Sequence, residues 1–408
     1  MSTPQAVRRR GRPGLSLATL FLGMFVLGSA ELLVVGVLNL IAADLHVSLP
    51  AAGTLVTAYA LGLAIGGPVL TALTIRLDRR TVLAGALALF ALGNLVAVLT
   101  DGYGLFLAVR VLTGALQGLF IAAAFAAGIS VVPPERMGRA ISVVVSGVAV
   151  SAALGVPLGT LVGQTLGWRG SFTAIIVLSA LALVATLALV PSVPGSGGGA
   201  GDQVRHALAP RVLAVLGLNV LVFAALYSAL TYIVPFLESV TGISGALTSA
   251  FLLAYGVAAA VGSFGGGRFA DRNAARTLTV ATTGTAVALL ALHLVGAVPV
   301  LVAPVLLVWG LFAFGMVPSL QYRVVSLAGP GGGLASSLPA SAANIGIAVG
   351  SAAGGAALGG STASAPVLTG LAIAVVAIPV SWATGLLRPP TVEEVTEADS
   401  RARVKPSA

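Results

Sequence analysis

The sequence contains no cysteine, which excludes disulfide bonds, thiolate catalysis and cysteine-ligated metal sites. Only three histidines are present, and they are too scattered along the chain to form a ligand set for a metal ion. No Walker-type phosphate loop, GxSxG elbow or HExxH pattern occurs, so an ATP-driven pump or a membrane hydrolase has no support. We therefore predict no enzymatic activity, no catalytic or metal-ligating residue and no cofactor.

Charge is also scarce. Only 8% of the 408 residues are charged, 58% are hydrophobic, and the mean hydropathy is +1.07, which excludes a soluble globular protein. The net charge of +9 comes from short clusters of arginine between apolar runs, so we expect no nucleic-acid partner. At about 20 apolar residues per helix, the length predicts an all-α membrane protein with about a dozen spans.

Apolar runs of membrane-spanning length predict twelve transmembrane helices, at about 15–41, 50–75, 81–100, 104–131, 140–164, 170–190, 211–236, 245–267, 277–298, 300–322, 334–359 and 364–387. A Gly- and Ser-rich linker at 191–210 divides them into two six-helix bundles, at 15–190 and 211–387. Polar tails are expected at 1–14 and 388–408.

The positions of the arginines predict the orientation of these spans. One side of a twelve-span arrangement carries Arg8 to Arg12, Arg76, Arg79, Arg80, Arg136, Arg139, Arg205, Arg211, Arg268, Arg272, Arg276, Arg323 and Arg388. Arg169 alone falls on the other side, where Asp44, His46, Asp101 and Trp168 are also expected in loops. Both termini are therefore predicted to be cytoplasmic. Twenty arginines to one lysine indicate a GC-rich bacterial genome, so we expect the inner membrane of a bacterial cell.

The two halves of the sequence share an internal repeat. An offset of 196 residues places Tyr59 on Tyr255, Gly66 on Gly262, Arg76 on Arg272, Arg80 on Arg276, Thr81 on Thr277 and Gly114 on Gly310. An offset of 195 places Ser146, Gly155 and Gly159 on Ser341, Gly350 and Gly354. Two parallel repeats with a site at their interface are typical of transporters that rock their halves around a midplane cavity.

Several motifs carry a family resemblance. The loop GRFADRNAAR, with Gly267, Asp271, Arg272 and Arg276, resembles the GxLaDRxGRK signature of the major facilitator superfamily. The equivalent first-half loop keeps Arg76, Arg79 and Arg80 but has Thr71 and Ile75 where that family usually has Gly and Asp, and Asp78 is the acid that could substitute. Arg110-Val-Leu-Thr-Gly114 is similar to the family's RxxxG pattern, whose arginine is associated with proton transfer.

Gly147 and the stretch Gly155-Val-Pro157-Leu-Gly159 resemble the Gly-Pro motif of antiporters. Independently of the resemblance, small residues allow close helix approach, and Pro157 would bend a helix that must change its packing. AADL at 42–45, AYALG at 58–62, GWRGSF at 167–172 and NIGIAVG at 344–350 are similar to bacterial twelve-helix drug:proton antiporters, in the branch with chloramphenicol, arabinose and purine-nucleoside exporters. The resemblance implies the fold of the superfamily and efflux driven by protons.

Glu31 lies well inside the first apolar run, where an isolated carboxylate costs on the order of 3 kcal/mol and is usually functional. It lies about 24 Å along its helix from the inner boundary, and Arg110 lies about 9 Å along its helix from the outer one. Across a core of about 30 Å these depths are similar, so the two side chains could interact directly or through water. We predict that Glu31 and Arg110 are proton-coupling residues. The alternative is a static pair that fixes helix packing.

Other side chains are candidates for the substrate cavity. Gln117 follows Arg110 by seven residues and so falls on the same helix face. Asn39 and Asn344 are similar amides, and Tyr227, Trp309 and Phe312 could supply the aromatic wall that an apolar substrate needs. At the 196-residue offset, Glu31 corresponds to Tyr227 and Arg110 to Leu306, so the charges are confined to the first half.

The sequence thus predicts a proton-coupled efflux transporter for a small lipophilic or amphipathic compound, such as a drug or a secondary metabolite, working as a monomer in the lipid bilayer. One alternative is a sugar or nucleoside exporter of the same superfamily, which would require more hydrogen-bonding groups. The other is a nontransporting membrane sensor or assembly factor, against which the presence of both Glu31 and Arg110 argues.

Overall fold

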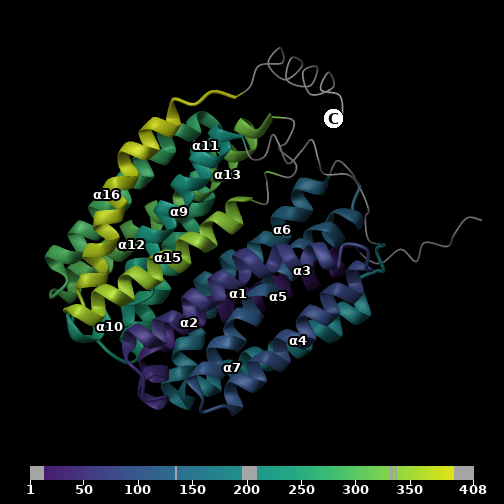
Figure 1. The fold of residues 1–408 in the computed structure, drawn as a ribbon, viewed down its shortest axis with the longest axis horizontal. Coiled ribbons are helices and arrows are strands. Elements are labelled where there is room, and N and C mark those ends of the chain that lie inside the picture. Colours follow the sequence, from purple (N-terminus) through teal and green to yellow (C-terminus); the bar gives the residue numbers. More distant parts are fainter. Residues whose placement is uncertain (1–12, 134–135, 195–208, 330–334, 336–337, 390–408) are drawn as a thin grey trace, which may run out of the picture. The chain divides into compact units, whose positions relative to one another are not determined.

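The computed structural model describes residues 13–133, 136–194, 209–329, 335 and 338–389, and this part of the chain is helical, without a β-strand (Figure 1). Its helices are α1 (Pro13–Asp44), α2 (Leu49–Leu61), η1 (Gly62–Gly66), α3 (Gly67–Leu73), α4 (Arg79–Leu99), α5 (Tyr103–Ser130), α6 (Met137–Val150), η3 (Ser151–Gly155), α7 (Val156–Leu189), α9 (Pro210–Leu230), α10 (Ile233–Ser239), α11 (Ala246–Val295), α12 (Pro299–Gly315), α13 (Val317–Ala328), α15 (Leu338–Gly360) and α16 (Ala365–Gly385). Most of the predicted tails and linker lies outside the described residues.

Ten described segments are long and apolar enough to cross a membrane. Two of them, Val143–Leu189 with 47 residues and Ala246–Val295 with 50, are about twice the length that one span requires. Each contains one break in helical geometry, at Gly167 (φ 73°) and at Asn273 (φ −160°). Dividing these two segments at their breaks gives the twelve spans predicted from the sequence.

The chain forms two compact units. Unit 1 comprises Met1–Gly197, Tyr232–Ser239 and Ile243–Gly256, and unit 2 comprises Gly198–Thr231, Val240–Gly242 and Val257–Ala408. Unit 1 therefore includes α10 and the start of α11, although both belong to the second half of the sequence. In Figure 1, α1 runs alongside α6 and α7, against which it packs within unit 1.

Local sequence signals fix where several helices begin and bend. The Ser48 hydroxyl accepts a hydrogen bond from the Ala51 amide at the start of α2, and Pro50 occupies the first turn. The π-helical segments η1 and η3 interrupt spans two and five, and η3 ends directly before α7, whose first turn contains Pro157. Such π-bulges often occur at functional sites.

Glycines allow the helices of both units to pack closely, because they lack a Cβ. A Cβ at Gly155 would lie 2.1 Å from the Ser29 hydroxyl, and a Cβ at Gly350 would lie 2.3 Å from the backbone oxygen of Ala224. These two contacts are related by 195 residues, from Ser29 to Ala224 and from Gly155 to Gly350. The same helix packing is thus present in α1 with η3 and in α9 with α15.

The packing also corrects the register of the repeat. Two further contacts recur at the offset of 195: Gly159 on Leu33 with Gly354 on Ser228, and Gly28 on Ser151 with Gly346 on Phe223. The contacts of α1 and α9 therefore place Leu226 in the position of Glu31, one residue before the predicted Tyr227. The offset of 196 remains correct between η1 with α5 and α11 with α12, where Gly66 on Ala115 corresponds to Gly262 on Leu311.

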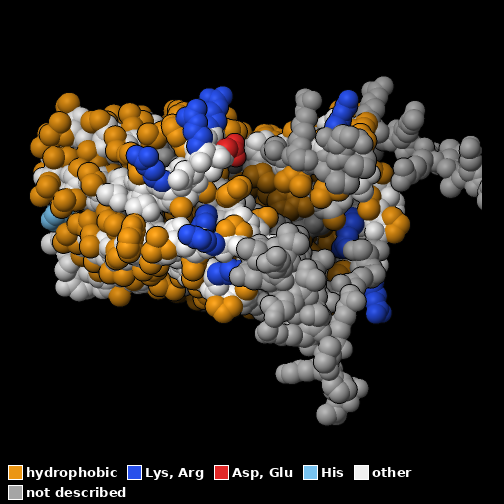
Figure 2. All heavy atoms as spheres, turned by 90° about the horizontal axis from the view of Figure 1, so that it is seen from above, with side chains coloured by type: hydrophobic (Ala, Val, Ile, Leu, Met, Phe, Trp, Pro, Cys, Tyr) orange, Lys and Arg blue, Asp and Glu red, His pale blue; other side chains and the backbone are white. Residues whose placement is uncertain are grey.

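The described surface is mainly apolar, as a lipid-facing surface must be. Leu73, Leu99 and Val300 are 74%, 75% and 81% exposed. Figure 2 shows hydrophobic side chains over most of the visible described surface, with arginines in separate groups and little acidic surface on that face.

Candidate functional site

Glu31 lies in the middle of α1 and is half-buried in unit 1. Its carboxylate oxygen Oε2 accepts a hydrogen bond of 2.6 Å from Nε2 of Gln117, on the facing helix α5. The sequence predicted that Gln117 would share a face with Arg110, and the structure adds that this face lies against Glu31. An amide in this position can compensate part of the cost of burying the acid without neutralising its charge.

A second contact extends this arrangement to α2. The hydroxyl of Tyr59 donates a hydrogen bond to Oε1 of Gln117, and the Tyr59 ring lies 3.9 Å from the guanidinium carbon of Arg110. Glu31, Gln117, Tyr59 and Arg110 therefore form one continuous network, called the Glu31 network below. Gln117 uses both ends of its amide in the network, which fixes its orientation.

Arg110 is only 1% exposed, and it binds to backbone oxygens. It donates to the carbonyls of Leu55 at 3.2 Å, Ala30 at 3.1 Å and Glu31 at 3.3 Å, and so joins α5 to both α1 and α2. The predicted proximity of Glu31 and Arg110 is thus present, but their side chains form no ion pair. Arg169, by contrast, forms ion pairs with Asp44 and Asp101.

This geometry has a chemical consequence. Three carbonyl dipoles and an aromatic face stabilise the buried guanidinium of Arg110, so its charge does not depend on a carboxylate partner. The Glu31 carboxylate is held by one amide and keeps lone pairs that can accept a proton. The arrangement can therefore change the protonation of Glu31 while Arg110 stays in place.

The other predicted cavity residues divide between the two units. Asn39 is in unit 1, and its amide donates to the carboxylate of Glu238 on α10. Tyr227, Trp309, Phe312 and Asn344 are in unit 2. The structure therefore brings Glu31, Arg110 and Gln117 together in one unit and places the predicted aromatic wall in the other.

Within unit 2 these candidates have distinct surroundings. Tyr227 stacks on Phe223 of the same helix, with ring centroids 6.5 Å apart. Trp309 is fully buried, and the ring of Phe312 packs over Gly284 of the neighbouring span. Asn344 is 7% exposed, and its amide donates to the Ala340 carbonyl one turn earlier in α15.

The predicted switch loop of the first half is anchored by Asp78. One carboxylate oxygen accepts from the Thr81 amide at 3.1 Å and so caps α4, and the other accepts from the Ser192 hydroxyl at 2.5 Å. Burial by itself would raise the pKa of Asp78, but the hydrogen bonds from Ser192 and from backbone amides outweigh it and hold the pKa below its ordinary value. Asp78 therefore joins the start of α4 to the segment that follows α7.

The arginines of the same loop strengthen this connection. Arg80 donates to the carbonyl of Leu187 near the end of α7, and the Arg79 amide donates to Val193 at 2.8 Å. Arg79 is 7% exposed and also donates to the Ile75 carbonyl, whereas Arg76 is exposed. Three consecutive residues, 78 to 80, thus bind the end of span six.

In the second half, the predicted switch loop lies around the break in α11. Asp271 and Arg272 are exposed, and Asn273 caps the following helix by accepting from the Arg276 amide at 2.9 Å. A Cβ at Gly267 would meet no atom within 4 Å, so close packing does not explain a glycine there. Asn273 lies one residue before position 274, where the offset of 196 places Asp78, and it caps its helix with an amide in place of a carboxylate.

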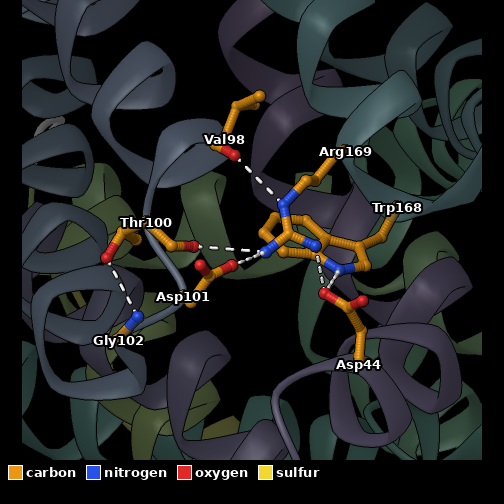
Figure 3. A network of polar contacts seen from close by, with 7 residues as sticks. All are labelled: Asp44, Val98, Thr100, Asp101, Gly102, Trp168 and Arg169. Atoms are coloured by element: carbon orange, nitrogen blue, oxygen red, sulfur yellow. Dashed lines mark hydrogen bonds and ion pairs between the residues drawn. The ribbon is translucent and has the colours of Figure 1, made fainter.

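A second polar network forms around Arg169, which sequence patterns alone place in an outer loop (Figure 3). Its guanidinium pairs with Asp44 at the end of α1 and with Asp101 at 2.7 Å. It also donates to the carbonyls of Val98 at 3.1 Å and Thr100 at 3.3 Å, which end α4. One side chain therefore joins the ends of spans one and three to the break between spans five and six.

Trp168 supports this network from the same motif. Its ring nitrogen donates to Asp44 at 2.9 Å, and its ring lies 4.5 Å from the guanidinium carbon of Arg169. The ring also stacks on Phe106, with centroids 5.2 Å apart, and meets Phe172 edge-on. The GWRGSF stretch was the available signal, because Gly167 supplies the positive φ of 73° that the break requires.

No group of three or more His, Asp or Glu residues in the described ranges is placed to hold a metal ion.

Comparison with curated proteins shows similarity to transporters. The chain is 36% identical over 344 residues to the Escherichia coli (strain K12) inner membrane transport protein YdhP, covering 83% of this chain and 88% of that protein. It is 31% identical over 378 residues to a chloramphenicol resistance protein of Streptomyces lividans, covering 91% of this chain and 93% of that protein.

Solved structures show the same fold at low sequence identity. A bacterial homologue of the human lysosomal transporter Spinster matches with a TM-score of 0.73 at 14% identity, over 93% of this chain and 98% of that one. A D-xylose–proton symporter matches with a TM-score of 0.72 at 16% identity, over 90% and 97%. The sequence profile of the Major Facilitator Superfamily matches residues 20–338. The chain therefore belongs to the major facilitator superfamily of membrane transporters.

Proposed function

We propose that this transporter is a proton-coupled exporter that moves a small lipophilic or amphipathic compound out of the cell by alternating access. The observation that carries the proposal is the Glu31 network, in which a half-buried carboxylate lies beside a buried guanidinium without forming an ion pair with it. A carboxylate inside a membrane span that is not neutralised by a cation is suited to exchange a proton.

The proposed exchange uses this geometry directly. Arg110 stays bound to the carbonyls of Ala30, Glu31 and Leu55 and keeps a fixed positive charge near the carboxylate. Protonation of Glu31 removes the negative charge near Arg110, and release of the proton restores that charge. Proton and substrate would compete for the same site, so that the proton gradient drives efflux and no cofactor is required.

The substrate class is inferred from composition and from one relative. The chain has few amides in its spans, and aromatic side chains such as Tyr227 and Trp309 suit an apolar compound better than a sugar. A relative with 31% identity is a chloramphenicol resistance protein, which favours efflux of compounds of that size and polarity. The inner membrane is the proposed location, and the arginine distribution supports cytoplasmic termini.

The substrate class is tested with a compound panel that includes chloramphenicol, in a drug-hypersensitive bacterial host with and without the protein. We expect raised resistance to at least one lipophilic compound and none to sugars or nucleosides. Absence of any effect across the panel would contradict the proposal of an exporter.

Proton coupling is tested in proteoliposomes loaded with a compound from that panel, under an imposed pH gradient. We expect Glu31→Gln to lose efflux driven by the gradient, because glutamine keeps the shape and the hydrogen-bonding capacity but cannot titrate. Asp101→Asn is the matched control, since this acid is 96% exposed and an exposed ion pair contributes only about 0–1 kcal/mol. Gradient-driven efflux that is unchanged in Glu31→Gln would remove Glu31 from the mechanism.

A further inference from the structure

Glu238 is an acid that the predicted spans left out, because the seventh span was expected to end at residue 236. It lies near the end of α10, a short helix that is separated from α9 by a turn at Thr231 and Tyr232. The division between the two units falls at this turn, so α10 belongs to unit 1 and packs against α1. The side chain of Glu238 is exposed, whereas Ile233 to Leu237 on the same helix are buried.

The contact between Glu238 and Asn39 leaves one polar atom of the Asn39 amide without a hydrogen bond among the described residues. Nδ2 of Asn39 donates to Oε2 of Glu238, while Oδ1 of Asn39 is buried and has no hydrogen-bond partner among the described residues. An ionised carboxylate can only accept hydrogen bonds, so it cannot satisfy this amide oxygen. A protonated carboxyl group offers one acceptor and one donor, and therefore matches both ends of the Asn39 amide.

The charged groups around Glu238 also favour the neutral acid. Neither α1 nor α2 contains a lysine, arginine or histidine. The acids of α1 are Glu31, which binds Gln117, and Asp44, which binds Trp168 and Arg169. Tyr59 on α2 donates to Gln117, and the hydroxyl of Tyr232, just before α10, lies beside Gly53 of α2. The basic residue nearest in sequence to Asn39 is His46, in the loop after α1, whose charge acts on Asp44.

We propose that Glu238 is a second proton-binding residue of this transporter, protonated while α10 lies on α1 and deprotonated when α10 separates from it. Binding of a proton would then hold α10 on α1, and water would remove the proton once the contact opens. Its place in the transport cycle rests on the proposed proton-driven efflux, since a proton bound at the outer end of the spans would favour closure there after substrate release.

The test measures the separation of α10 from α1 directly. The chain has no cysteine, so Val234→Cys introduces a single thiol at a position on α10 that is 3% exposed. Labelling by a membrane-impermeant maleimide is followed in proteoliposomes across external pH, with rates corrected for the reactivity of a free thiol. We expect labelling to accelerate as pH rises, by up to about tenfold per pH unit, which is the limit for one linked proton.

Two variants in the same Val234→Cys background identify the group responsible. Glu238→Gln carries a permanent donor and acceptor, so labelling should be slow and independent of pH. Asn39→Leu removes the amide that the protonated acid matches, so labelling should already be fast at acidic pH. A pH slope that persists in Glu238→Gln, or an Asn39→Leu profile identical to that of the parent, would overturn the proposal.

Glu31→Gln in the same background separates this inference from the proposed function. The pH slope of labelling should survive in Glu31→Gln, and a flat profile there would assign the slope to Glu31 and overturn the role of Glu238. Failure of the proposed function would instead appear as unchanged efflux in Glu31→Gln, a result that does not depend on the labelling slope.

Discussion

The two halves of this transporter share a set of helix contacts but differ in the side chains at the positions of the Glu31 network. At the packing offsets, three residues of the Glu31 network have apolar counterparts in the second half, Leu226 for Glu31, Leu306 for Arg110 and Ala313 for Gln117, and Tyr59 corresponds to Tyr255. The three apolar counterparts are each at most 1% exposed. The second half thus builds the same helix contacts with packing alone.

This difference shows that the second half forms the same helix contacts without a counterpart of Glu31, Arg110 or Gln117. Burying a guanidinium, a carboxylate and an amide is costly in a membrane, and leucine or alanine serves the same packing positions in the second half. The glycine contacts, which do recur in both halves, are the structural part of the repeat. The polar residues that do not recur are the part that we assign to transport.

The largest expected effect comes from making the first half resemble the second with Arg110→Leu. This change removes the three charge-assisted hydrogen bonds by which Arg110 joins α5 to the carbonyls of Ala30, Glu31 and Leu55, each worth about 1.5–3 kcal/mol. We expect a large drop in the thermal unfolding temperature in detergent and loss of efflux. Arg110→Lys should recover part of the stability, because lysine keeps the charge but not the planar fork. An Arg110→Leu protein that is as stable as wild type would show that the three carbonyls do not need this side chain.

A smaller effect is expected from adding a methyl group to the shared glycine contacts. Gly350→Ala would place its Cβ 2.3 Å from a backbone oxygen of Ala224, which cannot rotate away, and overpacking of this kind costs about 1–3 kcal/mol. Gly155→Ala would meet the Ser29 hydroxyl, which can change rotamer, and the Ser29 Cβ at 2.8 Å, which cannot, so it should be destabilising but less so than Gly350→Ala. Gly265→Ala is the control, since no atom lies within 4 Å of its Cβ position. Thermal unfolding of the three variants checks this order, and equal losses for Gly350→Ala and Gly265→Ala would contradict it.

The smallest effect distinguishes the two helix caps by pH. The lowered pKa of Asp78 means that its cap stabilises the folded state fully above the ordinary carboxyl pKa of about 4 and loses this contribution as pH falls through the lowered value. Asn273 caps the equivalent helix without titrating. Asp78→Asn should therefore reduce the difference in unfolding free energy between neutral and acidic pH by about 1 kcal/mol or less. Thermal unfolding at the two pH values measures this difference. An equal acid-induced loss in wild type and Asp78→Asn would mean that other groups are responsible.

Much of the fold could be predicted because membrane spans follow from composition and length, and the repeat follows from residue identity. Glu31, Arg110 and Gln117 could be grouped because the depth of a residue in a span and its helix face both follow from counting residues along the helix. The hydrogen bond from Tyr59 to Gln117 could not, since it depends on how α2 packs against α5. The register at Leu226 likewise required the glycine contacts between α1 and η3 and between α9 and α15.

The contacts of two polar residues could not be predicted from the sequence, for different reasons. The charge pattern predicts Arg169 only as a loop residue, because its role depends on the fold bringing the ends of α1 and α4 to one side chain. Glu238 lay just beyond an apolar run, where an acid usually marks the end of a span. Only the contact with Asn39, 199 residues away in the chain, gives it a specific partner.

The most direct test of the difference between the halves is to count the protons released when substrate binds. Purified protein in weakly buffered detergent solution, with a pH indicator, is mixed with an exported compound identified in the resistance panel. We predict that wild type releases protons on binding and that Glu31→Gln releases fewer, although the compound still binds. Equal proton release by wild type and Glu31→Gln would contradict the assignment of Glu31 as the proton site of this transporter.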